Sequence, residues 1–368
     1  MSAPPRFLVS GYYGFGNAGD EAILGGLVEG FRELCPQAEL TVLSGNPAET
    51  IAEHGVIAVP RGLAFARRHI ALSDVVISGG GGLLQDATSW RSPLYYLAII
   101  HFAKWARRPV ACIGQSIGPL KRPWVRSLLR RELARVDVVA VRDEVSRDTL
   151  VRLGLSRSIE ISADLAFLLP RPTEAEIAAV REKAGVSDVR EPVAAVALRR
   201  LPGAADDGGV RQVAAAVGRA CGELGLRPLL IPMQPTQDVD LARSAAAAMA
   251  PNGAITAPAM RAREILALVA SCRLMIAMRL HALIFAALCG IPPIAISYDP
   301  KVDGVMQQLG LRPAATLGQF SPDQLVRAIA ETWSGRGNVS EMLAARAPRL
   351  RSLALRNVEL ALSLLPKR

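Results

Sequence analysis

The sequence predicts two α/β domains in tandem, each built on a parallel sheet, with a ligand-binding cleft at the carboxyl ends of the strands. The chain has 368 residues, of which 51% are hydrophobic, and this is enough for two separate cores. Its strand-like segments are continuous apolar runs between helical segments, which is typical of parallel strands covered on both faces. A proline-punctuated connector, residues 171–192, separates a first alternation of strands and helices from a second.

We expect the N-terminal domain, residues 1–170, to form the acceptor side of the cleft. Its predicted strands are Phe7–Ser10, Leu40–Ser44, Val75–Ser78, Val110–Ile113 and Val138–Val141. Its predicted helices are Asp20–Leu34, Pro93–Ala106 and Val125–Leu133.

We expect residues 193–340 to form the C-terminal domain. Its predicted strands are Val193–Leu198, Pro228–Ile231, Leu274–Ala277 and Pro293–Ser297. Its predicted helices are Val210–Leu224, Asp238–Ala248, Arg261–Ala270 and Leu280–Leu288. The remaining segment, 341–368, contains an amphipathic helix, predicted over Arg349–Leu365, that would cross back to the N-terminal domain.

A glycine loop follows the first strand, where Gly14, Gly16 and Gly19 spell the G-x-G-x-x-G pattern of dinucleotide-binding proteins. Two features argue against NAD. Gly14 lies three residues beyond Gly11, where the strand is expected to have ended, and the second predicted strand ends without an acid for the ribose hydroxyls. The pattern is also explained by a tight turn before a helix.

The polar residues of this loop are candidate sugar ligands. Asn17 or Asp20 is expected to cap the helix that follows. Tyr12, Tyr13, Asn17 and Asp20 crowd the end of one strand, and their side chains are of the types that stack on sugars and hydrogen-bond to them. Whether Asp20 only caps the helix or also handles a sugar hydroxyl stays open.

A second glycine loop, Ser78–Gly82, follows another predicted strand. Its glycines, with Gly80 and Gly81 at the centre, allow close approach of a ligand to the backbone, or else close packing of helix and strand. The loop lacks the Gly-Lys-Ser/Thr ending of a nucleoside-triphosphate loop. Gln85 and Asp86 come directly after it and are candidate hydroxyl ligands.

The strand ends of the C-terminal domain carry cations and a histidine. Arg279 and His281 lie at a predicted helix N-terminus, which favours a bound anion. Lys301 follows the next strand, in Ser-Tyr-Asp-Pro-Lys, and Arg142 ends a strand of the first domain. Ordinary surface or ion-pair roles remain the alternatives for Lys301 and Arg142. A free imidazole titrates near ~6.5, so His281 suits proton transfer.

Four motifs in chain order resemble those of the polysaccharide pyruvyl transferase family, most closely its CsaB-type bacterial members. They are Gly-Tyr-Tyr-Gly-Phe-Gly-Asn-Ala-Gly-Asp-Glu-Ala, Ser-Gly-Gly-Gly-Gly-Leu-Leu-Gln-Asp, Arg-Leu-His-Ala and Ser-Tyr-Asp-Pro-Lys-Val. The resemblance implies a GT-B-like fold of two Rossmann-like domains with an interdomain cleft. It also implies pyruvyl transfer from phosphoenolpyruvate to an N-acetylmannosamine-type sugar of a lipid-linked cell-wall precursor. The resulting cyclic ketal would serve to anchor surface-layer proteins.

The resemblance also assigns roles. His281 and Lys301 match the family's essential histidine and lysine, and Arg142 is the best match for its essential first-domain arginine. We expect His281 and Asp20 to be catalytic and Arg142, Arg279 and Lys301 to bind the donor. Tyr13, Asn17, Gln85 and Asp86 would bind the acceptor. No cofactor and no metal are expected, with phosphoenolpyruvate as co-substrate, since no cluster of metal-ligating residues stands out.

The net charge of +10 points to anionic partners or to an arginine-rich composition. Two segments, Lys104–Arg108 and Lys121–Arg126, place tryptophan among basic residues, which fits either an anionic membrane surface or a solvated helix face. Dispersed basic residues and 5% aromatic content argue against nucleic acid as a partner.

We expect a cytoplasmic protein at the inner face of the cell membrane, with five reduced cysteines and no signal peptide.

A GT-B glycosyltransferase with a nucleotide-sugar donor is the alternative function. It would share the fold, so the fold alone does not separate the two. The sequence shows no acidic residue placed to hold a nucleotide ribose.

Overall fold

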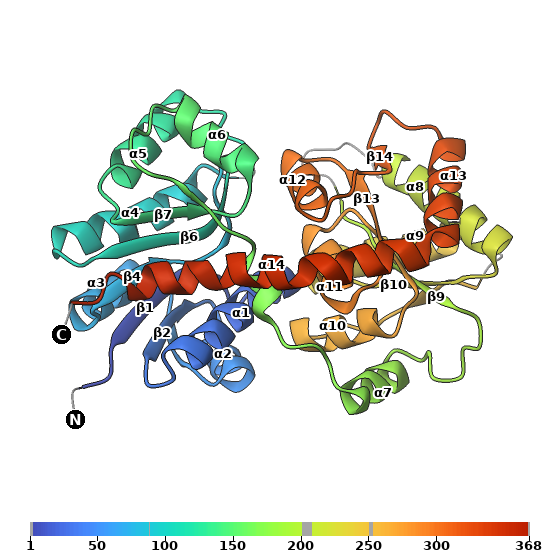
Figure 1. The fold of residues 1–368 in the computed structure, drawn as a ribbon, viewed down its shortest axis with the longest axis horizontal. Coiled ribbons are helices and arrows are strands. Elements are labelled where there is room, and N and C mark those ends of the chain that lie inside the picture. The colour runs from blue at the N-terminus through green and yellow to red at the C-terminus, as the bar shows by residue number, and fades with distance from the viewer. Residues whose placement is uncertain (1–2, 88, 201–207, 250–252, 367–368) are drawn as a thin grey trace. The chain divides into compact units, whose positions relative to one another are not determined.

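The protein is described from a computed structural model that covers residues 3–87, 89–200, 208–249 and 253–366. The chain divides into two compact units. Unit 1 comprises Met1–Phe15, Asp20–Leu169 and Arg349–Arg368, and unit 2 comprises Gly16–Gly19 and Pro170–Pro348. The last helix, α14 (Arg336–Leu362), is drawn in red in Figure 1 and contributes residues to both units.

Unit 1 is built on an eight-stranded parallel sheet with the order β3-β2-β1-β4-β6-β7-β8, in which β5 also pairs with β6. The strands are β1 Arg6–Tyr13, β2 Glu39–Ser44, β3 Ile57–Pro60, β4 Val75–Ser78, β5 Gly81–Leu84, β6 Val110–Ile117, β7 Val138–Val141 and β8 Glu160–Ile161. Every residue of β4 and β6 is buried, because helices cover both faces of the sheet.

The helices of unit 1 are α1 Ala18–Leu34, α2 Pro47–His54, α3 Leu63–Leu72, α4 Arg91–Trp105, α5 Pro123–Leu133 and α6 Glu144–Arg152, with a 3-10 turn at Leu165–Leu168. Some of these helices begin with a capping side chain or a proline, as α2, α5 and α6 do. In α6, Asp143 accepts a hydrogen bond from the Ser146 amide at 2.7 Å, which satisfies one amide of the first turn.

Unit 2 repeats the same strand order, β11-β10-β9-β12-β13-β14, again with all pairs parallel. Its strands are β9 Val193–Ala197, β10 Arg227–Leu230, β11 Ile255–Thr256, β12 Leu274–Ala277, β13 Pro293–Ser297 and β14 Ala315–Thr316. Its helices are α7 Glu174–Lys183, α8 Gly208–Leu224, α9 Pro235–Ala248, α10 Ala262–Ala270, α11 Leu280–Cys289, α12 Pro300–Gln308 and α13 Pro322–Ser334. This is the strand order of Rossmann folds, so the predicted pair of Rossmann-like, parallel-sheet domains is confirmed.

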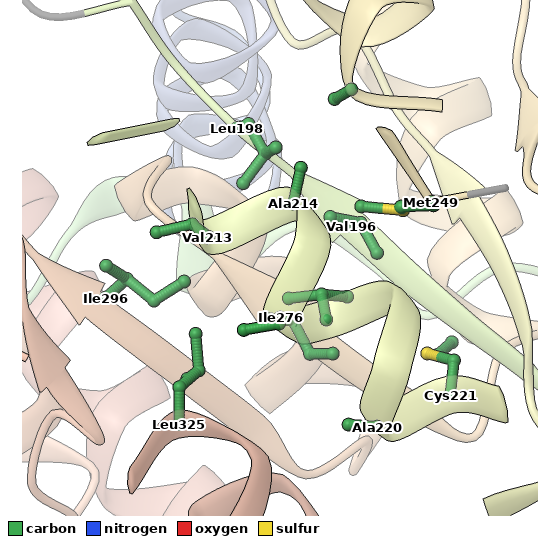
Figure 2. Close-up of a cluster of buried hydrophobic side chains, with 14 of the residues drawn as sticks. Val196, Leu198, Val213, Ala214, Ala220, Cys221, Met249, Ile276, Ile296 and Leu325 are labelled. Carbon is green, nitrogen blue, oxygen red and sulfur yellow. The ribbon is translucent and has the colours of Figure 1, made fainter. Parts of the chain in front are cut away.

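The core of unit 2 joins helix α8 to the sheet. Figure 2 shows Val213 and Ala214 of α8 beside Val196 and Ile276, which belong to the central strands β9 and β12. Small residues dominate α8 in this contact, so the helix can lie close to the sheet.

Several strand ends differ from the prediction. Strand β1 continues through Gly11 to Tyr13, so Gly14 directly follows it and the expected early end was wrong. The register of β1 against β2 shifts between Ser10 and Tyr13, an irregularity that period-2 patterning does not reveal. Strand β6 likewise runs to Ile117 instead of Ile113 because the polar Gln115 and Ser116 are buried in the sheet.

The last helix was also predicted too short, because it begins at Arg336 rather than Arg349. Pro348 lies inside this helix, one residue before the predicted start. In unit 1 the buried Asn357 donates from Nδ2 to the carbonyl of Ala163 at 3.0 Å. This bond ties the end of the chain to the segment that follows β8.

The five cysteines are free thiols, as the sequence predicts. Burial raises the pKa of Cys112, Cys221, Cys272 and Cys289 to about 12, so these thiols stay protonated at neutral pH. No helix among the described residues combines the length and the apolar character needed to cross a membrane.

Two adjacent glycines of α1 provide a test of the packing in unit 1. A Cβ added at Gly26 would overlap the carbonyl oxygen of Leu165. One at Gly25 would lie 3.1 Å from the flexible Leu169 side chain and 3.7 Å from the His54 ring. We expect Gly26→Ala to lower the free energy of unfolding by roughly 1–3 kcal/mol or more, as overpacking does. Gly25→Ala is the matched control, and its helix-propensity gain should keep it within about 1 kcal/mol of the wild type. Urea unfolding of both variants measures this, and equal stabilities would contradict the packing described.

Candidate functional site

The carboxyl ends of β9 and β12 lie at the point where the strand order of the second sheet reverses. In open α/β sheets ligands bind at this point. Arg279 and His281 follow β12 and form the start of α11, with Arg279 as its N-cap residue. The sequence prediction that these two residues stand at a strand end and a helix N-terminus is confirmed.

Arg279 is held by a carboxylate that the sequence analysis did not single out. Its Nη2 donates to Oδ1 of Asp238, and both side chains are buried. The other oxygen of Asp238 accepts from the Met233 and Gln234 amides, at 3.1 and 2.9 Å. Because a buried charge needs such partners, Asp238 fixes the orientation of the guanidinium relative to the ends of β10 and β12.

His281 lies against the first glycine loop. The segment Gly16–Gly19 belongs to unit 2, where the Ala18 amide donates to the Met233 carbonyl at 2.9 Å. A Cβ on Gly19 would overlap Nδ1 of His281. The last glycine of the loop is therefore required by its close approach to this imidazole.

Lys301 lies in the first turn of α12, whose N-cap Asp299 accepts from the Lys301 amide at 3.1 Å. Its Nζ lies 3.2 Å from Oδ2 of the same aspartate, and the side chain is half-buried. The structure thus keeps the ammonium at the carboxyl end of β13, the strand next to β12.

Arg199 is a further cation at this edge, and the sequence analysis missed it. It follows β9, and its Nη1 donates to the hydroxyl of Tyr298, beyond the end of β13, at 2.7 Å. Since β12 lies between these two strands, the guanidinium reaches across the strand end that leads to His281. Its Nε is buried and has no hydrogen-bond partner within the described part of the chain. Its position directly after a predicted strand was the available signal.

Asn17 precedes the first residue of α1, whereas Asp20 lies within that helix. Oδ1 of Asn17, the residue directly before the helix, accepts from the amide of Gly19, the second helical residue, at 3.1 Å. Asn17 therefore takes the capping role, and Asp20 lies inside the first turn. A Cβ on Gly81 would lie 3.1 Å from Oδ1 of Asp20, which places that carboxylate beside the second glycine segment.

The charge of Asp20 acts on three tyrosines of unit 1. Burial raises the pKa of Tyr12, Tyr13 and Tyr96, and the charge of Asp20 adds to each rise. The three phenols consequently stay protonated and can act as donors at neutral pH. The hydroxyls of Tyr13 and Tyr96 are buried and find no hydrogen-bond partner among the described residues. Tyr13, predicted to contact the acceptor, is fully buried, with its ring against Gly11 and Gly79.

Four aromatic rings gather around Arg61, and we call them the aromatic cluster: Tyr12, Phe15, Tyr95 and Tyr96. Arg61 lies 4.2 Å from the ring centroid of Tyr95 and 5.0 Å from that of Phe15. Tyr12 stacks on Phe15 at 4.4 Å. All these residues except Tyr96 are half-buried, so part of each remains accessible. Arg61 directly follows β3 and Tyr95 belongs to α4, and the spacing of the sequence did not indicate that these two residues meet.

The glycine-rich segment Gly79–Gly82 is partly a strand, because β5 begins at Gly81. A Cβ on Gly79 would overlap the Tyr13 hydroxyl, and one on Gly80 would lie 3.0 Å from the Gly114 carbonyl. Gln115 donates from Nε2 to the Gly79 carbonyl. Close packing therefore accounts for these two glycines.

The two polar residues after this segment have local partners. Oε1 of Gln85 accepts from the Ala87 amide at 2.8 Å. The buried carboxylate of Asp86 accepts from the amides of Lys121 and Arg122, at 2.5 and 2.8 Å. Asp86 thus joins the start of α5 to the end of β5, and its role as an acceptor ligand stays a prediction.

Arg142 is buried in unit 1 between two acids. Its Nη1 donates to Oδ2 of Asp164 at 2.6 Å, and its Nε lies 3.7 Å from Oδ2 of Asp143. The ion pair links β7 to the turn before Leu165. A direct role of Arg142 in donor binding stays a prediction.

Solved structures share this architecture. HepE from Anabaena, in complex with UDP and glucose, has a TM-score of 0.66 over 98% of both chains at 15% identity. MnaA from S. aureus, solved with UDP, has a TM-score of 0.66 over 99% of this chain and 98% of its own at 11% identity. E. coli ADP-heptose lipopolysaccharide heptosyltransferase II gives 0.53 over 90% and 99%, at 13% identity. The chain therefore has a GT-B-type fold.

The sequence defines the family. The profile of the polysaccharide pyruvyl transferase family matches residues 17–300, so the chain belongs to the polysaccharide pyruvyl transferase family. The amylovoran biosynthesis protein AmsJ of Erwinia amylovora is 26% identical over 285 residues, which make up 71% of this chain and 65% of AmsJ. The family is one of transferases, and the matched region spans just under two thirds of the length of AmsJ.

The close approach of Gly19 to His281 yields a prediction. Gly19→Ala should displace the imidazole, while the free energy of unfolding changes by no more than about 1 kcal/mol, because alanine favours the helix. Histidine Cε1–H NMR spectra measure this: the His281 signal should shift, and those of His54, His69 and His101 should not. Gly337→Ala is the control, since a Cβ there meets no atom within 4 Å. An unmoved His281 signal in Gly19→Ala would disprove the contact.

Proposed function

We propose that the protein transfers a pyruvyl group from phosphoenolpyruvate to a saccharide, with formation of a cyclic ketal and release of phosphate. The observation that carries the proposal is the gathering of Arg199, His281 and Lys301 at the carboxyl ends of β9, β12 and β13. Membership of the family supports the class of reaction.

The proposed donor is a small trianion, which suits this edge of the sheet. Phosphoenolpyruvate carries a carboxylate and a phosphate, and both are ligands that guanidinium groups bind through paired hydrogen bonds. Arg199 keeps a buried Nε–H available, and the N-termini of α11 and α12 add their dipoles. Arg279 is already paired with Asp238. It would therefore bind the donor only through the N–H groups that this ion pair leaves over, in the orientation that Asp238 fixes.

The proposed reaction adds two sugar hydroxyls to C2 of the donor. Both O–H bonds break, one proton ends on C3 to form the methyl group, and the other leaves with the phosphate. His281 would deliver the proton to C3, and its position in the first turn of α11 supports this role. Asp20 would accept the proton of an attacking hydroxyl.

The acceptor would bind to unit 1. Half-exposed rings of the aromatic cluster provide faces for a pyranose, and Asp20 with the buried tyrosine hydroxyls provides polar partners. An N-acetylmannosamine-type unit of a lipid-linked cell-wall precursor is the acceptor that we propose, with the ketal as an anchor for surface-layer proteins. AmsJ, a protein of amylovoran biosynthesis, supports a polysaccharide substrate in general.

The first prediction on this reaction concerns His281. Incubation with phosphoenolpyruvate and synthetic N-acetylmannosaminides should release phosphate and give a pyruvylated product, detected by mass spectrometry. His281→Ala should lower turnover by about 10²–10⁴-fold, the usual contribution of a positioned acid or base. His69→Ala, which changes a half-buried histidine of α3, is the control and should retain full activity. Nucleotide release from a UDP-sugar without use of phosphoenolpyruvate would support the glycosyltransferase alternative instead.

The second prediction concerns Arg199. Arg199→Ala should raise the apparent KM for phosphoenolpyruvate roughly 10- to 100-fold, because a hydrogen bond to a charged group contributes about 1.5–3 kcal/mol. Arg243→Ala, an exposed arginine of α9, is the matched control. Steady-state kinetics at saturating acceptor separates the two variants, and an unchanged KM in Arg199→Ala would remove this residue from the donor site.

A further inference from the structure

We propose that unit 1 docks onto the surface of an anionic lipid bilayer through a surface formed by Trp90, Arg91, Lys121, Arg122 and Trp124. We call it the Trp90–Trp124 surface. The inference does not depend on the proposed reaction, because it follows from exposed side chains and charge.

Two tryptophans that are far apart in the sequence lie together on this surface. Their ring centroids are 6.0 Å apart, with an interplanar angle of 74°, yet Trp90 is 41% exposed and Trp124 is 47% exposed. Exposure of an indole ring to water is unfavourable in free energy. At the headgroup level of a membrane the ring can contact acyl chains while its N–H group contacts water. The edge-to-face arrangement leaves no pair of parallel platforms for stacked bases, which favours a lipid surface over nucleic acid.

Hydrogen bonds of Asp86 hold together the chain segments that carry the two tryptophans. Trp90 is the N-cap residue of α4 and Trp124 lies in the first turn of α5. The Asp86 carboxylate binds the Lys121 and Arg122 amides, and Nη1 of Arg122 donates to the Asp86 carbonyl at 2.8 Å. Since Asp86 lies four residues before Trp90, these bonds fix the two helix starts beside each other.

Basic residues outnumber acids in the stretch of the chain that contains both tryptophans. Residues 85–133 contain nine lysines and arginines but only two acids, Asp86 and Glu132. Both acids are 1% exposed and engaged by basic partners. Four of the nine, Arg91, Lys121, Arg122 and Arg126, lie within three residues of Trp90 or Trp124 in the sequence. Neither α4 nor α5 has an acid in its first turn, so the positive ends of both helix dipoles add to the field.

A vesicle-binding experiment with tryptophan fluorescence tests the proposal. The chain has four tryptophans, so W105F/W333F keeps only Trp90 and Trp124, and W90F/W124F keeps the other two. Vesicles of equal parts phosphatidylglycerol and phosphatidylcholine should shift the emission of W105F/W333F to the blue and leave that of W90F/W124F unchanged. Vesicles of phosphatidylcholine alone should have little effect on either. A shift confined to W90F/W124F would overturn the proposal.

Charge variants complete the test. Each basic residue near an anionic leaflet raises the partition coefficient roughly fivefold, so R91Q/K121Q should lower vesicle binding about 25-fold. R243Q/R356Q removes the same charge from exposed sites on other helices and is the matched control. Equal losses in the two variants, or salt-sensitive retention of single-stranded DNA with no vesicle binding, would disprove docking by this surface. Circular dichroism of every variant excludes unfolding as the cause, and no step of the experiment requires enzymatic turnover.

Discussion

The requirement that a parallel sheet be covered on both faces organises this protein. Each strand must return through a helix to the same end of the sheet, so all carboxyl ends of the strands and the following helix N-termini meet at one edge. In unit 2 this edge brings together residues from three neighbouring strands: Arg199 after β9, His281 after β12 and Lys301 after β13. The N-termini of α11 and α12 lie at this same edge, so the topology favours an anion there before any side chain is considered.

Buried carboxylates pair with some of the charged groups at these edges and fix their orientation. Asp238 orients Arg279, Asp164 holds Arg142, and Asp86 binds backbone amides at the start of α5. Each of these acids is almost completely buried and fully engaged, since an uncompensated buried charge would be costly. The basic groups that keep accessible or unpaired polar atoms within the described residues, Arg199 above all, are consequently better candidates for ligand contact than those in closed pairs.

The sequence largely predicted which segments form helices and which form strands, but it did not predict where they end or which of them contact one another. The apolar runs at Val138–Val141, Leu274–Ala277 and Pro293–Ser297 gave strands with the predicted bounds. Strand β1 went further than predicted, because its irregular pairing with β2 places Gly11 and Tyr13 inside the sheet. Short or polar elements such as β3, β5 and α6 were missed, since their formation depends on pairing and packing rather than on their own periodicity.

The sequence by itself determined the two-sheet architecture, the family and the presence of His281, Arg279 and Lys301 at strand ends, because hydrophobic periodicity and short motifs are local properties. Only the tertiary structure decided that Gly19 lies against His281, that Asp238 neutralises Arg279 and that Arg199 reaches Tyr298. The same holds for Arg61 within the aromatic cluster and for Trp90 beside Trp124. These contacts join residues far apart in the chain, and their distances depend on how helices pack on a sheet, which no local pattern encodes.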